Sequence, residues 1–298
     1  MSFNSLDELI AFASSRPKRR IAVAAAADLH VLEAIKKACE LKFIEAILIG
    51  KKEEISSIIA SIGLKKEFFS IIDEADPGQA CIRAVSIIRE GNADILMKGM
   101  VPTATIIKAV LDREKGLRKR DTLSHFALFQ TAHYHKLLGI SDAAMNISPG
   151  INEKINIIEN AVDVMRGLGV SNPKVAILAP IETVNQKISS TVDAEALQQM
   201  NKNNQIRNCI IHGPLALDNA ISKEAAQQKG IISEVAGDAD ILITPDLNSG
   251  NILYKSLVFL SDCKVAAIIT GANAPIVLTS RADSDINKLY SIALAASL

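Results

Sequence analysis

Short apolar runs alternate along the chain with stretches in which apolar residues recur every three or four positions. The short runs predict buried strands at 21–26, 46–49, 95–97, 174–179, 240–244 and 265–270, and the run at 69–72 suggests a further one. The longer periodic stretches predict helices at 29–38, 55–62, 78–90, 103–112, 192–200, 251–260 and 285–296. This alternation indicates an α/β fold with mostly parallel sheets flanked by helices on both faces.

The middle of the chain is harder to interpret from its pattern. Residues 125–129 have the composition of a strand, and a second strand is expected near 136–140. The Pro149-Gly150 pair predicts a turn, at which a domain could change.

Length and composition narrow the class of protein. The 298 residues are enough for two domains, and 49% of them are hydrophobic, so the chain can bury a large core. Lys and Arg together number 33, as do Asp and Glu, which argues against a general nucleic-acid or membrane-surface binder. Aromatic residues make up only 4%, so stacking platforms for single-stranded nucleic acid are not expected.

The cysteines and the N-terminus point to the cytoplasm. The four cysteines form no C-x-x-C pair, which predicts reduced and mostly buried thiols rather than a zinc or redox site. The first 20 residues contain no apolar segment of the signal-peptide kind, and no apolar run is long enough to span a membrane.

Ligands of parallel sheets bind beyond the carboxyl ends of the strands, so the residues that follow each strand are the first candidates for chemistry. Lys98 and Gly99 follow one predicted strand, and Thr103 begins the next helix. A cation beside helix N-terminal N–H groups suits an anion. The alternative is that Lys98 only extends along the edge of the sheet and Thr103 only caps a helix.

Two further loops carry polar residues at strand ends. The first contains Asp246, Asn248, Gly250 and Asn251, followed by Lys255 in the next predicted helix. Turn formation and helix capping could use some of these side chains, but their density favours the wall of a binding site.

The other loop runs from Thr279 to Asp285. Arg281 offers a planar guanidinium that suits a phosphate or carboxylate, and Ser280 places a hydroxyl beside it. Here the alternative is a surface ion pair, with Ser284 or Asp285 capping the last helix.

Several common motifs are missing from the sequence. It has no G-x-G-x-x-G, no G-x-x-x-x-G-K-[ST] and no G-x-S-x-G, which weakens the dinucleotide-binding, P-loop and α/β-hydrolase interpretations. The five histidines show no H-x-x-x-H spacing, and the lone H-x-H of His133 and His135 is weak evidence, so no metal site is expected.

Seven stretches, in order along the chain, resemble the phosphate acetyl/butyryltransferase family, and its butyryl branch more than its acetyl branch. They are Leu96–Thr105, Ser141–Ile147, Asp193–Met200, His212–Asn219, Val235–Leu242, Pro245–Lys255 and Ala274–Ser284. The resemblance extends from about residue 20 to the C-terminus, and the combination of motifs is specific although each one alone is weak.

The resemblance implies both a reaction and a fold. The reaction converts acyl-CoA and phosphate reversibly into acyl phosphate and free coenzyme A, with no metal and no tightly bound cofactor. The fold is similar to that of isocitrate and isopropylmalate dehydrogenases, with two α/β domains facing an active-site cleft. The expected domains are residues 1–140 with 274–298, and residues 141–273. A homodimer or higher homo-oligomer is also implied, with neither nucleic acid nor membrane as a partner.

Carried over residue by residue, the resemblance places Ser280 and Arg281 at the reacting centre. Arg281 would hold the phosphoryl group, and Ser280 would hydrogen-bond the thiol or the oxyanion. The position of the carboxylate that accepts the thiol proton in acetyl-type members is Asn287 here, so Asp283, Asp285 or another residue would have to replace it. A cysteine nucleophile is a weaker idea, because no cysteine lies in a matched motif. The residues expected to bind substrate are Lys98, Thr103, Asp246, Asn248, Gly250, Asn251 and Lys255.

Three alternatives remain open at this point. Acetyl-CoA could be the main substrate instead of butyryl-CoA. The chain could be a metal- and NAD-dependent dehydrogenase on the same scaffold. It could also be a non-catalytic relative that binds coenzyme A or phosphate, for which the missing carboxylate at Asn287 is the best support.

Overall fold

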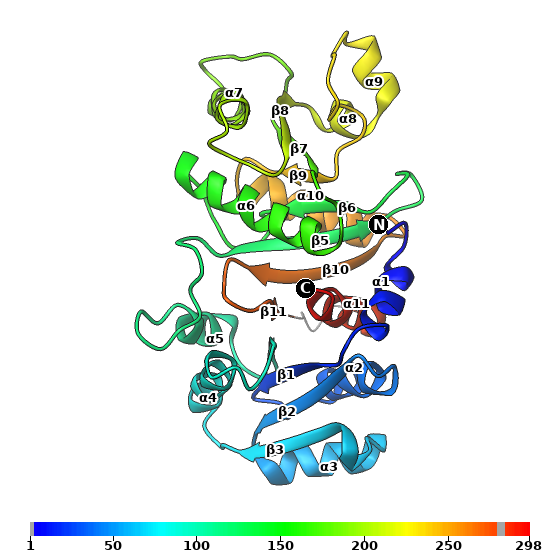
Figure 1. Cartoon of the computed structure of the whole chain (residues 1–298), viewed down its shortest axis with the longest axis vertical. Coiled ribbons are helices and arrows are strands. Elements are labelled where there is room, and N and C mark those ends of the chain that lie inside the picture. Colours follow the sequence, from blue (N-terminus) through cyan, green and yellow to red (C-terminus); the bar gives the residue numbers. More distant parts are fainter. Residues whose placement is uncertain (1–2, 279–283) are drawn as a thin grey trace. The chain divides into compact units, whose positions relative to one another are not determined.

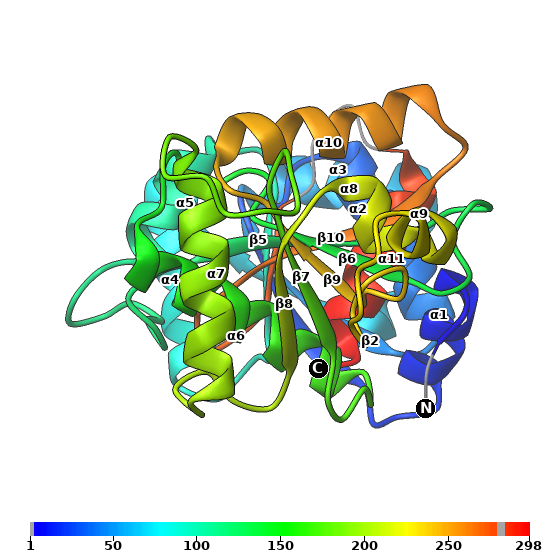
Figure 2. The ribbon, with the colours of Figure 1, turned by 90° about the horizontal axis from the view of Figure 1, so that it is seen from above.

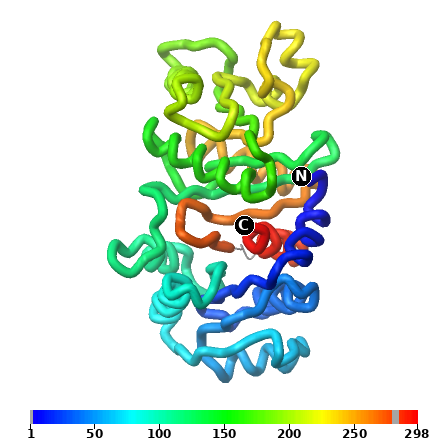
Figure 3. Tube along the Cα trace, viewed as in Figure 1, coloured from blue at the N-terminus to red at the C-terminus, as the bar shows by residue number. Residues whose placement is uncertain are grey.

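The computed structural model describes residues 3–278 and 284–298 of the chain. Contacts within it divide the chain into two compact units, each assembled from separate segments. Unit 1 combines residues 3–6 with Asp121–Val265, and unit 2 combines Asp7–Arg120 with Ala266–Leu298. Figure 3 shows how the C-terminal segment returns to lie beside the first elements of unit 2.

The sheet of unit 2 has the strand order β3-β2-β1-β4-β11-β10. Its strands are β1 (Arg19–Ala24), β2 (Ile44–Gly50), β3 (Phe69–Asp73), β4 (Ile95–Lys98), β10 (Lys264–Thr270) and β11 (Ile276–Val277). They are parallel except for β10, which is antiparallel to β11. The carboxyl ends of five strands therefore meet at one edge of this sheet.

Helices cover both faces of this sheet (Figure 1). On one face α4 and α5 pack together, and on the other α2 packs against α3 and α11. The helices of unit 2, with α1 at its start, are α1 (Leu6–Ser14), α2 (Leu29–Glu40), α3 (Lys52–Ile62), η1 (Lys66–Phe68, a 3₁₀ turn), α4 (Pro77–Arg89), α5 (Thr103–Val110) and α11 (Asp285–Ala296).

The strands of unit 1 pair in the order β5-β6-β9-β7-β8. Its strands are β5 (Ser124–Gln130), β6 (Leu138–Ser141), β7 (Lys174–Leu178), β8 (Ile210–Leu215) and β9 (Ile241–Ile243). Only β5 runs antiparallel to its neighbour β6. The prediction of an α/β fold with mostly parallel sheets is confirmed for both units.

In unit 1, α6 and α7 contact each other and lie on one face of the sheet, while α8 and α9 lie on the other (Figure 2). The helices are α6 (Ile151–Gly167), α7 (Ser189–Lys202), α8 (Leu217–Ile221), α9 (Lys223–Gln228) and α10 (Leu247–Leu260). Within the described residues, no helix combines the length and apolar character needed to cross a membrane.

Local chemistry explains where several helices begin and end. The side chain of Asp76 accepts the backbone N–H of Gln79 at 2.7 Å and caps α4, whose first residue is Pro77. Both features stabilise a helix start, since proline has no N–H to leave unsatisfied there. Gly91 follows α4 with a φ of 74°, a left-handed conformation that glycine adopts without steric cost.

The structure corrects several sequence-based boundaries. β1 begins two residues before the predicted strand, because Arg19 and Arg20 already pair with β2. The helix predicted from residue 251 begins at Leu247, since Asp246 caps it. The sequence pattern also did not predict α6 and β8. The apolar positions of α6 are interrupted by Lys154 and Asn160, which are both buried through polar contacts.

An ion-pair network joins the amino ends of β7 and β9 to the segment before β6. Asp238 accepts hydrogen bonds from Lys174 and from His135, the latter at 2.7 Å, and it lies 3.2 Å from the Nζ of Lys136. Burial alone would raise the pKa of Asp238, but the hydrogen bonds from Lys174, His135 and Lys136 outweigh it and hold this pKa well below its usual range.

This network predicts an acid-sensitive contribution to stability. We expect Asp238→Asn to lower the free energy of unfolding by about 2 kcal/mol at pH 7, since a hydrogen bond to a charged group is lost. The stabilisation from a depressed folded pKa is fully present above the ordinary carboxyl pKa of about 4, and it is lost progressively as the pH falls from there towards the folded pKa. Urea unfolding of both proteins between pH 7 and pH 3 measures the difference.

The exposed Asp262 provides the control, because Asp262→Asn removes a carboxylate outside this network. Its unfolding free energy should stay within about 0.5 kcal/mol of the native value. A deficit of Asp238→Asn that is the same at pH 7 and pH 3 would contradict the assignment.

Candidate active-site residues in the two units

Lys98 lies at the carboxyl edge of the unit 2 sheet, at the end of β4. Its Nζ donates to the carbonyl oxygens of Gly99 and Val101, each at 3.2 Å. β11 runs parallel to β4 with Val277 opposite Met97. The end of β11 therefore lies beside Lys98.

The loop after Lys98 is held against β1 by a very close approach. Gly99 donates its N–H to the carbonyl of Ala24, and a Cβ on Gly99 would lie 2.2 Å from the carbonyl oxygen of Ala25. Only glycine fits there. Thr103 is exposed and is the first residue of α5, whose N-cap is Pro102, so the expectation that Thr103 caps the helix is wrong.

A small hollow opens at the same edge of unit 2. Its volume is about 140 Å³, and its lining residues follow β1, β2, β3 and β4. Small side chains and a glycine make room for the hollow, and two acidic groups and one lysine also line it. The lining residues are Ala25, Ala27, Gly50, Lys51, Glu54, Glu74, Ala75, Pro77 and Met100.

Ser280, Arg281 and Asp283 lie outside the described residues. The structure describes both flanks of the segment that contains them. β11 precedes it, and Ser284 follows it as the N-cap of α11, with its hydroxyl accepting the N–H of Asn287 at 3.3 Å. Asp285 is the first residue of α11 and is half-buried. The roles expected for Ser280, Arg281 and Asp283 stay predictions.

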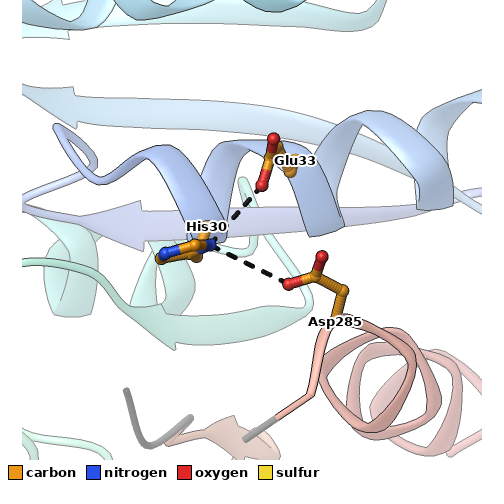
Figure 4. A group of neighbouring side chains, drawn as sticks. All are labelled: His30, Glu33 and Asp285. Carbon is orange, nitrogen blue, oxygen red and sulfur yellow. Dashed lines mark ion pairs between the residues drawn. The ribbon is translucent and has the colours of Figure 1, made fainter. Parts of the chain in front are cut away.

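Asp285 belongs to a cluster that the sequence did not predict (Figure 4). Its Oδ1 lies 3.9 Å from the Nδ1 of His30, and the same Nδ1 lies 3.5 Å from the Oε2 of Glu33. The ligand atoms of the three residues lie within 4.8 Å of one another, as they would around a metal ion. No sequence signal could reveal it, because 252 positions separate Glu33 from Asp285.

In unit 1, Asp142 organises the carboxyl edge of the sheet. This buried residue follows β6 and accepts the backbone N–H groups of His125, Ala144 and Met145 through Oδ1. Its other oxygen accepts both the backbone N–H and the side-chain amide of Asn146. One carboxylate thus shapes the loop that the sequence matched as Ser141–Ile147.

The loop before α10 packs against the Asp142 loop. Asn251 donates its side-chain amide to the carbonyl of Ala143 at 3.1 Å, and Thr244 donates its hydroxyl to the carbonyl of Asp142 at 2.9 Å. A Cβ on Gly250 would lie 2.2 Å from that same Asp142 oxygen. The structure therefore brings two motifs, about 100 positions apart, into one cluster.

Not every predicted residue of this loop faces outward for binding. The carboxylate of Asp246 accepts the N–H of Ser249 at 2.8 Å and caps α10, so the capping alternative holds for it. Asn251 and Gly250 also support the loop. Asn248 and Lys255 are exposed, and they are the members of this group best placed to meet a ligand.

His125, the second residue of β5, lies beside Asp142 and was not predicted as a site residue. Its ring packs edge-on against Tyr254 of α10, with centroids 5.5 Å apart. Burial lowers the pKa of His125, and the nearby Asp142 carboxylate opposes that shift only in part. The imidazole is therefore neutral at neutral pH and packs into the wall beneath the two loops.

The motifs match those of known proteins over most of the chain. A family model described as "Phosphate acetyl/butaryl transferase" matches residues 74–296. A phosphate butyryltransferase from Clostridium acetobutylicum is 44% identical over 98% of this chain and 97% of its own length. A phosphate acetyltransferase from Thermotoga maritima is also 44% identical, over 98% of both chains.

The chain belongs to the phosphate acetyl/butyryltransferase family. This confirms the resemblance, and it makes the chain an enzyme that transfers an acyl group between coenzyme A and phosphate. The interpretation as a non-catalytic binding relative is therefore not retained.

Solved structures agree on the fold. A branched-chain phosphotransacylase from Enterococcus faecalis superposes with a TM-score of 0.84, at 33% identity, over 94% of this chain and 98% of its own. A putative 4-hydroxythreonine-4-phosphate dehydrogenase from Salmonella typhimurium gives a TM-score of 0.59 at 12% identity, over 94% and 99% of the two chains. The dehydrogenase likeness shows the fold alone. The cleft expected between two domains stays a prediction.

The cysteines of this transferase fit a structural role. All four are free thiols, and Cys39, Cys81 and Cys209 are buried. Burial raises the pKa of Cys39 to about 12, that of Cys81 to about 11 and that of Cys209 to about 12. A thiol is nucleophilic only as the thiolate, so these three are unsuited to attack at neutral pH.

Gly250 provides a test of the unit 1 cluster. We expect Gly250→Ala to lower the free energy of unfolding by about 1–3 kcal/mol, because its Cβ would overlap the Asp142 carbonyl oxygen. Turnover should fall more than stability alone explains, since the two loops must separate. Urea unfolding and steady-state assays measure both effects.

Gly150→Ala is the matched control in the same unit. A Cβ there would meet only the carboxylate of Glu153, at 3.8 Å, and its φ of −74° suits any residue. We expect it to retain native turnover. Equal losses in both variants would show that the close approach at Gly250 has no special role.

Proposed function

We propose that this enzyme transfers a butyryl or similar short-chain acyl group between coenzyme A and inorganic phosphate, by direct attack in a ternary complex. The observation that carries the proposal is the match to the Clostridium acetobutylicum phosphate butyryltransferase along 98% of the chain. A Bacillus subtilis protein with the name probable phosphate butyryltransferase is 47% identical over 97% of the chain and supports the same choice.

The edge of unit 2 supports the binding of phosphate. Both coenzyme A and acyl phosphate are anions, and Lys98 supplies a cation where β4 ends and β11 leads into the last loop. Thr103 begins α5, whose first N–H groups add donors at the same edge. We propose that Lys98 and Thr103 bind phosphoryl oxygens.

The last loop completes this chemistry in the proposal. Arg281 would hold the phosphoryl group through its planar guanidinium, and Ser280 would donate to the oxyanion that forms on the acyl carbon. The nucleophile is the thiolate of coenzyme A, so no acyl-enzyme is required and coenzyme A acts as substrate. Asp283 and Asp285 are the carboxylates nearest to Arg281 in the sequence.

Unit 1 supplies substrate-binding residues on the proposed scheme, with Asn248 and Lys255 exposed for direct contact. Asp246, Gly250 and Asn251 act by holding the loop that presents them. This assignment divides the residues expected at this loop into two that touch the substrate and three that support the loop.

The alternative is a preference for acetyl-CoA, which the 44% identity to the Thermotoga maritima phosphate acetyltransferase favours. An assay of acetyl-, propionyl-, butyryl- and isobutyryl-CoA with phosphate, which measures thiol release, decides between them. We expect the highest kcat/KM with a four-carbon acyl group, by about 30-fold or more over acetyl, since it adds two methylenes that contribute about 1–3 kcal/mol each. Turnover of none of the four would contradict the proposed function.

Arg281→Gln tests the proposed phosphoryl contact. We expect kcat/KM to fall by about 10²–10³-fold, because the variant loses a charged donor to the reacting group. Arg113→Gln, at an exposed loop position, should keep native turnover. Undiminished turnover of Arg281→Gln would remove this residue from the mechanism.

We further propose a homodimer in the cytoplasm. Three apolar side chains of α10 are largely exposed, with 67% of Ile252, 68% of Phe259 and 84% of Leu260 accessible, which supports a partner on this helix. Four free thiols and a coenzyme A substrate support a reducing compartment.

A further inference from the structure

The proposed reaction needs an acceptor for one proton, and the sequence left that acceptor open between Asp283, Asp285 and another residue. The thiol of coenzyme A must lose its proton before the sulfur attacks, and the amide of Asn287 has no basic lone pair with which to take it. The need for another acceptor rests on the proposed function, because only that reaction requires the thiolate of coenzyme A.

His30 has the arrangement that such an acceptor needs (Figure 4). Its Nδ1 faces two carboxylate oxygens, at 3.5 Å from Glu33 and 3.9 Å from Asp285, while Nε2 points away from both. A proton on Nδ1 suits these two acceptors, and this tautomer leaves the Nε2 lone pair free to accept a proton. Carboxylates on one side also stabilise the imidazolium that forms.

The fold places this ring at the edge where the chemistry is proposed. Asp28 accepts the N–H of Val31 at 3.1 Å and caps α2, so His30 stands in the first turn, just beyond the carboxyl end of β1. β1 pairs with β4, which ends at Lys98. α2 packs against α11, and this contact brings Asp285 to the ring.

The exposure of the ring also fits the role. His30 is 62% exposed, so Nε2 is open to a substrate thiol, whereas His125 is packed beneath loops and has a lowered pKa because of burial. His133 is exposed as well, but it belongs to unit 1 and to a loop between β5 and β6.

The charges around the cluster favour a proton over a metal ion. Two carboxylates face the His30 ring: Glu33 on α2 and Asp285 on α11. Asp285 also faces two ammonium groups, with the Nζ of Lys288 at 3.7 Å from Oδ1 and the Nζ of Lys37 at 3.9 Å from Oδ2. A divalent cation bound here would meet both ammonium groups at close range.

We propose that His30 is the proton acceptor for the coenzyme A thiol and that Asp285, with Glu33, positions its ring. Nε2 takes the thiol proton while the sulfur attacks the carbonyl carbon of the acyl phosphate. The C–S bond forms, the C–O bond to the phosphate oxygen breaks, and its electron pair leaves with that oxygen. The imidazolium then returns the proton to that phosphate, so the products are the thioester and hydrogen phosphate.

The test is the pH dependence of thioester formation from butyryl phosphate and coenzyme A. We expect His30→Gln to lower kcat by about 10²-fold or more, and to remove the acidic limb of the kcat/KM profile, with little change in the KM for coenzyme A. Asp285→Asn should cause a smaller loss of kcat with little change in the KM for coenzyme A, because the ring loses one of the two carboxylates that position it.

His133→Gln is the matched control and should keep the native rate and profile. A thermal melt of each variant separates lost chemistry from lost structure. If the native enzyme is active and His30→Gln shows the same rate and the same acidic limb as the native enzyme, this inference is overturned. The proposed function stays intact in that case. A raised KM with an unchanged limb overturns this inference too, since His30 would then act only in binding.

Two other outcomes point elsewhere. Turnover that is lost in EDTA and restored by a divalent cation would make the cluster a metal site and overturn the role as proton acceptor. A native enzyme that turns over no acyl-CoA of the panel would overturn the proposed function, and this inference with it.

Discussion

The pairing of β11 with β4 is the interaction on which the unit 2 site depends. Two short strands meet in parallel register, with Ile276 opposite Leu96 and Val277 opposite Met97. A contact between residues about 180 positions apart therefore places the end of β11 beside Lys98, and the packing of α11 on α2 brings Asp285 to His30.

In both units, a glycine allows two loops at the carboxyl edge of the sheet to pack closely against each other. Gly99 lets the loop after β4 lie on β1, and Gly250 lets the first turn of α10 lie on the loop of Asp142. In each case a side chain would force two loops apart at the carboxyl edge of a sheet. In unit 1 a buried carboxylate then holds the loop in shape, since Asp142 accepts the N–H groups of its own loop.

Electrostatics differ between the two edges. The unit 1 edge is a wall of satisfied polar groups, in which Asp246 caps a helix and Asn251 bridges two loops. The unit 2 edge carries Lys98 at the end of β4 and, in the first turn of α2, an exposed imidazole beside two carboxylates. Acid–base chemistry needs groups that are still able to change charge, so the unit 2 edge is the better place for proton transfer.

The sequence alone determined the fold class, most helices and strands, and the family, because strand and helix periodicity and the order of seven motifs are local properties that a single chain displays. It also located Lys98 and the polar loop before α10 at strand ends. Local patterns failed where buried polar residues interrupt the periodicity, as Lys154 and Asn160 do in α6. Only the tertiary structure decided that Asn251 holds the loop of Asp142 and that His30 meets Asp285. These depend on which segments pack together across long separations, and spacing along the chain carries no record of such contacts.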